Sequence, residues 1–227
     1  MRKPRLSAAI VPKNSMRTSR KISEIGFKDR PTLRLNVADL MAWRHLILYT
    51  ALPLAYIVTG WLGLLLAAPP GYATAIFVPA GIAVTATFVA GAAALPGTFV
   101  GSFLLNLWIG YLIAGRLDLT QITAALVIAA ASVTQAAIGG TALRSATGYP
   151  VPFDNASDIL IFLLLAPIFC LTSATISLGG LWILGAVELH ELPMNWETWW
   201  VGDTLGVLVA LPLMIILGGE TFTRWRS

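Results

Sequence analysis

Asp203 is the only charged residue that lies well inside a long apolar run of this sequence. A charge at the middle of a membrane helix costs about 2.5–3.5 kcal/mol on insertion scales, so such residues usually have a function. Trp199 and Trp200 precede it at helical spacing, beside the carboxylate, and Gly202 and Gly206 leave space around it. This combination is typical of a site for a cation or a polar ligand. The alternative is an interfacial acid that reaches headgroup water or bonds to a neighbouring helix.

Three residues on two other apolar runs complete the candidate site. Pro79 and Gly81 interrupt the run at residues 74–94, at the same expected membrane depth as Asp203. Asn106 lies on the next run and nearer mid-membrane, where it would form the floor. We therefore predict a ligand-binding cavity open toward the periplasmic side and lined by Asp203, Trp199, Trp200, Asn106, Pro79 and Gly81. The alternative is packing, with a kink at Pro79 and an interhelical hydrogen bond from Asn106 worth about 0.6 kcal/mol.

The sequence has no grouping typical of catalysis or of a metal site. The apolar runs contain no paired carboxylates and no Ser/His/Asp or Cys/His combination. Glu188, His190 and Glu191 are explained most simply as exposed loop residues, and the single cysteine, Cys170, excludes an internal disulfide. We expect no catalytic residues, no metal and no cofactor, so the chain itself is not expected to be an enzyme.

The elements that position these residues must be membrane-spanning helices. Hydrophobic residues make up 57% of the chain and charged residues 11%, and the mean hydropathy is +0.78. The hydrocarbon core of a bilayer is about 30 Å thick and needs roughly 20 apolar residues per helix. The runs are too long and too uniformly apolar for barrel strands. The predicted fold is therefore all-α, a polytopic transmembrane helical bundle.

We predict about six spans. Pro69–Pro70–Gly71 should end the first, Pro96–Gly97 should make the turn between the second and third, and Gly179–Gly180 should kink or break the fifth unless that helix is strongly tilted. The expected spans are residues 45–67, 74–94, 97–114, 120–143, 157–186 and 198–218.

The positive charges predict the orientation of the chain. Eleven of the fifteen Lys and Arg residues lie in positions 1–44. With six spans, the positive-inside rule places both termini in the cytoplasm and leaves only Arg116 outside. The expected domains are a partly disordered basic cytoplasmic tail at 1–42, a transmembrane domain at 43–218 and a short cytoplasmic tail at 219–227. The basic tail is expected to touch anionic lipid and not nucleic acid.

Three sequence blocks stand out along the apolar runs: Phe77-x-Pro79-Ala80-Gly81-Ile82-Ala83, Pro96-Gly97-x-Phe99-x-Gly101-Ser102-Phe103-x-x-Asn106 and Trp199-Trp200-x-Gly202-Asp203-x-Leu205-Gly206-Val207 with Pro212. Together they resemble the membrane-associated sensor domain of the MASE type-one family. The resemblance covers about residues 45–218, and Asn106 and Asp203 fall at motif positions. It implies a sensory domain of the bacterial inner membrane, usually fused to a cytoplasmic histidine kinase, diguanylate cyclase or phosphodiesterase.

The chain departs from this family in two respects. Only residues 219–227 follow the sixth expected span, and the family often has eight spans. We therefore expect either a ligand-responsive sensory module that signals in trans through a cytoplasmic kinase or cyclic-dinucleotide enzyme, or a fragment or decayed relative of a larger sensor. A second copy of the chain is another candidate partner. The alternative function is the substrate-binding membrane subunit of a small-molecule transporter, similar to those of vitamin uptake systems. An intramembrane enzyme is the third reading.

The topology can be tested with reporter fusions. Alkaline phosphatase and fluorescent-protein fusions at Leu117, Pro150, Leu192 and Ser227 should report outside, inside, outside and inside in that order, because the cations are distributed in this way. Strong phosphatase activity of the fusion at Ser227 would overturn the count of spans.

Overall fold

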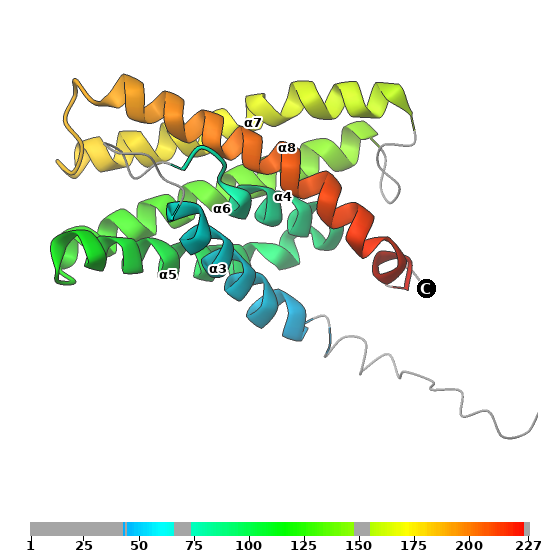
Figure 1. The fold of residues 1–227 in the computed structure, drawn as a ribbon, viewed down its shortest axis with the longest axis horizontal. Coiled ribbons are helices and arrows are strands. Elements are labelled where there is room, and N and C mark those ends of the chain that lie inside the picture. The colour runs from blue at the N-terminus through cyan, green and yellow to red at the C-terminus, as the bar shows by residue number, and fades with distance from the viewer. Residues whose placement is uncertain (1–42, 44, 66–73, 148–154, 225–227) are drawn as a thin grey trace, which may run out of the picture. The chain divides into compact units, whose positions relative to one another are not determined.

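The computed structural model describes residues 43, 45–65, 74–147 and 155–224, and within them only helices and connecting turns occur. The predicted all-α fold is therefore confirmed. The basic tail at 1–42, the turn at 69–71 and the last residues, 225–227, lie outside the described residues. The elements (Figure 1) are η1 (Ile47–Ala51), α3 (Leu52–Leu64), α4 (Val78–Ala90), η2 (Gly91–Ala94), α5 (Leu95–Ala114), α6 (Leu119–Thr147), α7 (Ala156–Ile183) and α8 (Leu192–Arg224).

Five helical stretches of the described residues are long and apolar enough to cross a membrane, which is close to the predicted six. The difference lies in Val78–Ala114, which counts as one stretch of 37 residues but contains both α4 and α5. These two helices are the predicted second and third spans. α4 has 13 residues and is therefore about 20 Å long, shorter than the hydrocarbon core.

The chain reverses direction between α4 and α5. Along α6, Gly140 contacts Thr87 of α4 and Arg144 approaches Gly91, so α4 runs parallel to α6. Along α5 the order of contacts with α6 is reversed. Ser102, which comes after Gly91 in the chain, contacts Ser132, which comes before Gly140. α5 therefore runs antiparallel to α6.

The turn that makes this reversal is not the predicted one. It lies at Gly91, whose φ of 68° is accessible to glycine at little cost, and not at Pro96–Gly97. Pro96 is in the first turn of α5, where backbone N–H groups have no partner within the helix, so the missing N–H of proline costs no hydrogen bond. Gly97 instead lets α5 approach the backbone of Leu48.

The prediction for Pro79 is also corrected, because Pro79 lies in the first turn of α4 and does not kink the interior of a helix. Of the alternatives for the fifth span, the break is excluded, because α7 runs as one helix through Gly179–Gly180. An unbroken helix keeps its backbone hydrogen bonds internal, which is what a lipid environment requires.

The start of α4 packs directly on the backbone of α8. The N–H of Phe77 donates to the carbonyl of Gly202 at 2.8 Å. An added Cβ at Gly206 would collide with the carbonyl of Phe77, and one at Gly81 would collide with the carbonyl of Gly206. The segment before α4 is not helical, and such backbone is tolerated in a membrane only where protein covers it.

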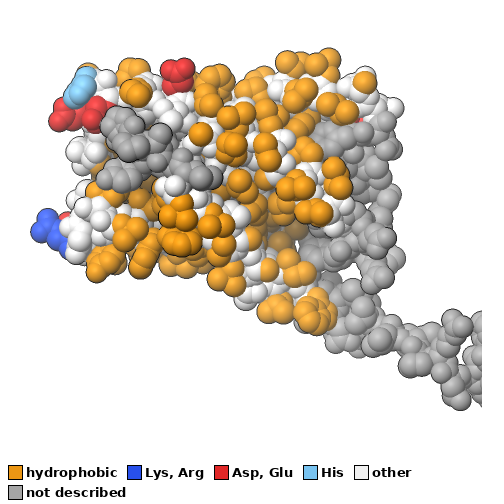
Figure 2. Space-filling view, in the orientation of Figure 1, with side chains coloured by type: hydrophobic (Ala, Val, Ile, Leu, Met, Phe, Trp, Pro, Cys, Tyr) orange, Lys and Arg blue, Asp and Glu red, His pale blue; other side chains and the backbone are white. Residues whose placement is uncertain are grey.

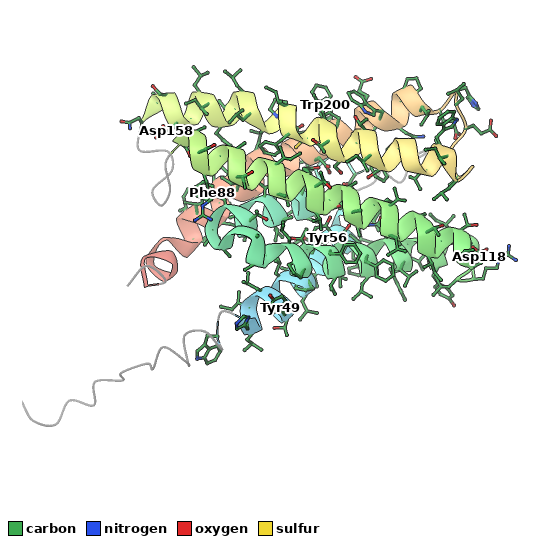
Figure 3. The ribbon with its side chains drawn as sticks, turned by 180° about the vertical axis from the view of Figure 1, so that it is seen from behind. Tyr49, Tyr56, Phe88, Asp118, Asp158 and Trp200 are labelled. Atoms are coloured by element: carbon green, nitrogen blue, oxygen red, sulfur yellow. The ribbon has the colours of Figure 1, made fainter. Side chains whose placement is uncertain are left out.

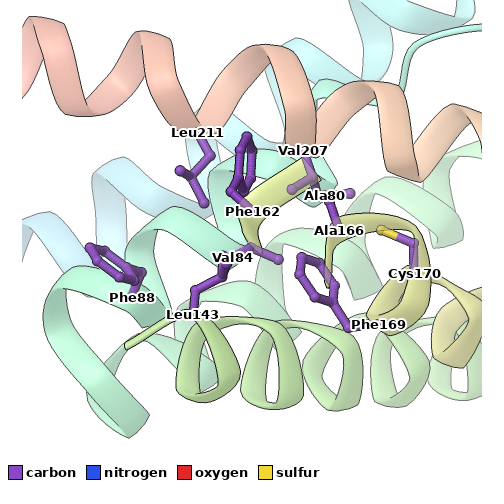
Figure 4. Close-up of a cluster of buried hydrophobic side chains, with 10 residues drawn as sticks. All are labelled: Ala80, Val84, Phe88, Leu143, Phe162, Ala166, Phe169, Cys170, Val207 and Leu211. Atoms are coloured by element: carbon purple, nitrogen blue, oxygen red, sulfur yellow. The ribbon is translucent and has the colours of Figure 1, made fainter. Parts of the chain in front are cut away.

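The main hydrophobic core lies between α4, α6, α7 and α8 (Figure 4). Val84, Phe169 and Val207 are representative, and none is more than 3% exposed. Large hydrophobic side chains also cover the outside of the bundle, while the coloured charged side chains gather toward one end (Figure 2). This pattern fits a bundle whose sides face lipid.

The α4–α8 contact can be tested with a single methyl group. Gly206→Ala should lower the free energy of unfolding by about 1–3 kcal/mol, the usual cost of overpacking, because the new Cβ meets the backbone of Phe77. Thermal unfolding of the protein in detergent measures this cost. Gly179→Ala is the matched control, since nothing lies within 4 Å of its added Cβ. Equal melting temperatures for the two variants would contradict the packing.

Candidate functional site

Asp203 lies on the inner face of α8 and is 7% exposed. Its carboxylate faces the hydroxyl of Ser173 on α7 and the side-chain amide of Gln135 on α6. Cys170 of α7 lies nearby. The acid is therefore in the protein interior, between three helices, and not at a lipid headgroup interface.

Gln135 connects this acid to α7 but is itself only partly satisfied. Its Nε2 donates to Sγ of Cys170 at 3.3 Å, while its Oε1 is buried without a hydrogen-bond partner. Oγ of Ser177, one turn along α7 from Ser173, is also buried without a partner. A buried polar atom without a partner costs about 1–3 kcal/mol. The group formed by Asp203, Gln135, Ser173, Ser177 and Cys170 is called the acid cluster below.

A second polar group lies between α3, α5 and α6. The hydroxyl of Tyr56 donates to Oγ of Ser132 at 3.2 Å, and Oγ of Ser132 and Ser102 are 3.0 Å apart. Nδ2 of Asn106 donates to the carbonyl of Ser102 at 2.8 Å. Ser132 and Gln135 are three residues apart on α6, so this hydroxyl cluster and the acid cluster are neighbours on one helix.

Both groups lie well within the bundle. Figure 3 shows Tyr56 and Trp200 between Asp118 at one end and Asp158 at the other. Asp118 and Asp158 stand at the starts of α6 and α7, where acids suit the helix dipole. The two polar clusters therefore lie at membrane depth, where water cannot substitute for a missing partner.

Two tryptophans of α8 donate hydrogen bonds to α7. Nε1 of Trp200 donates to the carbonyl of Pro167 at 2.8 Å, and Nε1 of Trp196 donates to Oγ1 of Thr175 at 3.1 Å. The two rings stack with centroids 5.8 Å apart. Trp199 is half-buried. The indole of Trp200 thus fixes the approach of α7 to α8 close to Asp203.

The six residues predicted to form the site are distributed over several contacts. Pro79 packs near Gly60 of α3, and Gly81 lies in the α4–α8 contact. Asn106 belongs to the hydroxyl cluster. A cavity lined by all six stays a prediction, because the neighbours that the structure assigns to Asp203 are others.

Sequence reasoning missed the partners of Asp203 on α6 and α7. Gln135 and the serines of α7 stand out as polar residues in apolar runs, but spacing along one helix cannot show which helix they face. The combination of one acid, two hydroxyls and an amide can bind a polar or cationic ligand. Within the described residues, no group of three His, Cys, Asp or Glu side chains could hold a metal ion.

A family model, MASE1, matches residues 47–225, which is most of the chain. No curated protein and no solved structure matches it.

A double-mutant cycle tests the hydroxyl cluster. Tyr56→Phe and Ser132→Ala should each lower thermal stability, and their coupling energy should be about 0.6 kcal/mol, typical of a hydrogen bond between membrane helices. Unfolding of the two single variants and the double variant in detergent gives this value. Tyr56→Phe combined with Thr123→Ala is the control and should be additive. A coupling energy of zero for the first pair would show that the bond contributes nothing.

Proposed function

We propose, since the chain belongs to the MASE1 family of membrane-associated sensory domains, that it detects a small polar or charged ligand at the acid cluster and passes the signal to a cytoplasmic partner. The observation that carries this proposal is the burial of Asp203 among hydroxyl and amide groups at membrane depth. An acid in that position destabilises the bundle unless it is compensated, and such residues commonly mark ligand or ion sites.

α8 offers a direct path from the cluster to the far end of the bundle. It is one helix of 33 residues, Leu192–Arg224, and Asp203 lies in its first half. Gly202 and Gly206, on either side of Asp203, make the backbone contact with α4. A ligand that favours one packing of α4 on α8 would shift the population of that packing. The C-terminal half of α8 would then report the shift.

The partner is proposed to be a histidine kinase or a cyclic-dinucleotide enzyme. The distribution of cations supports cytoplasmic termini and a multi-pass protein in the bacterial inner membrane. In this proposal the catalytic step belongs to the partner. The purified chain would neither phosphorylate itself nor make or cleave a cyclic dinucleotide.

Cross-linking in cells tests this function. A photo-cross-linking amino acid at Thr223, near the end of α8, should capture a histidine kinase, a diguanylate cyclase or a phosphodiesterase, identified by mass spectrometry. In membranes that contain the captured enzyme, Asp203→Asn should retain capture but fix the enzyme's activity at one level, because the amide keeps the shape and removes the charge. Glu197→Gln, at an exposed acid of the same helix, is the control and should behave as the wild type.

The transporter alternative predicts a different result. Capture of an ATPase pair, together with uptake of radiolabelled substrate into vesicles, would overturn the sensory proposal. An unchanged response of the partner enzyme in Asp203→Asn would remove the acid cluster from the proposal.

A further inference from the structure

Among the residues that the structure describes, no positively charged side chain faces the carboxylate of Asp203. α6 presents Gln135, α7 presents Ser173 and the thiol of Cys170, and α3 presents the phenol of Tyr56. α4 has no titratable side chain. Nothing that faces the carboxylate from these four helices can neutralise it, whereas buried acids in proteins are normally paired or neutralised.

The basic side chains of the described residues lie elsewhere. Arg144 is the nearest on α6, but it is nine residues beyond Gln135, about 14 Å along the helix axis, and lies beside Gly91. Arg224 is 21 residues beyond Asp203 on α8, about 32 Å along the helix axis. The remaining positions are at chain turns or at the start of the bundle: Arg116 pairs with Asp118, His190 pairs with Glu188, and His45 stacks on Tyr49.

Two buried oxygen atoms of the acid cluster lack a partner, and this is an independent sign of a ligand. Oε1 of Gln135 accepts nothing, and neither does Oγ of Ser177. Gln135 is 2% exposed and Ser177 is 0% exposed, so lipid and bulk water are both distant. The carboxylate of Asp203 faces Ser173 and Gln135, and Ser177 follows Ser173 by one helical turn on the same side of α7, so oxygen atoms of three helices lie in this region. Such a set suits a hard cation or a proton.

The charge of the cluster decides which ion fits. Asp203 is the only acid of the cluster, so a single positive charge gives a neutral site, while a divalent ion would leave a net positive charge in the bundle. In other membrane proteins with discontinuous helices, non-helical backbone lies beside the ion sites. In this protein, the non-helical segment before α4 contacts Gly202, the residue before Asp203.

We propose that the acid cluster is a site for one monovalent positive charge, delivered as a sodium ion or as a proton. A sodium ion would be coordinated by the carboxylate of Asp203 and the oxygens of Gln135, Ser173 and Ser177. A proton would reside on the carboxyl group of Asp203, which could then donate to Oε1 of Gln135. The inference rests on the proposed function, because it names the ligand class of the same cluster.

Thermal unfolding of the purified full chain in detergent tests the site. Sodium chloride is compared with choline chloride at equal ionic strength, at mildly acidic and mildly alkaline pH. If sodium binds, the melting temperature at alkaline pH should rise by about 3 °C in saturating sodium. If a proton binds, the melting temperature in choline should fall as the pH rises, because deprotonation leaves a bare charge in the core. Either result supports the proposal and identifies the ion.

Variants separate the site from other effects of salt and pH. Asp203→Asn should abolish both dependences, and Glu197→Gln, an exposed acid on the same helix, should leave them as in the wild type. Ser177→Ala keeps the acid and should weaken only a sodium effect, so it serves even if Asp203→Asn does not fold. Binding of radioactive sodium, compared between the wild type and Ser177→Ala, measures the sodium affinity directly.

Two results would overturn the proposal. One is a wild-type melting temperature that responds neither to sodium nor to pH. The other is a response that Asp203→Asn retains in full, since the charge would then bind elsewhere. Neither readout involves a partner protein. Failure here would leave cross-linking to a kinase or cyclase as an open and separate test of the proposed function.

Discussion

A carboxylate at membrane depth has to find all its compensation inside the protein, because neither lipid nor bulk water supplies it. Asp203 finds part of this compensation in the hydroxyl of Ser173 and the amide of Gln135, contributed by two different helices, and its charge stays unpaired. The acid therefore joins α6, α7 and α8 at one point. Trp200, with its bond to the carbonyl of Pro167, holds α7 and α8 together beside that point.

The backbones of α4 and α8 pack directly on each other beside Asp203. Gly206 and Gly81 allow α4 and α8 to touch without side chains between them. Helices in lipid gain little from burying apolar area, so contacts of this kind supply much of their association. In the proposed function, this direct backbone contact would carry a displacement of α8 at Asp203 to the start of α4.

Membership of the MASE1 family and this interior fit together. The family is a membrane sensory domain, and the bundle offers two neighbouring polar groups on α6, the acid cluster and the hydroxyl cluster of Tyr56, Ser132 and Ser102. Hydrogen bonds between membrane helices are individually weak. In the proposed function, these weak bonds would change partners when a ligand binds, whereas the apolar core around Val84 and Phe169 would keep the bundle folded.

The sequence alone determined the class of fold and singled out Asp203 as a buried acid, because long apolar runs and a charge within one of them are visible residue by residue. It also identified the family from short motifs. Only the tertiary structure decided that the turn lies at Gly91 and that Gln135 and Ser173 are the neighbours of the acid. Apolar sequence is nearly uniform on all faces of these helices, so it carries little information about which face meets which neighbour. That choice depends on which small residues let two backbones approach, as at Gly206.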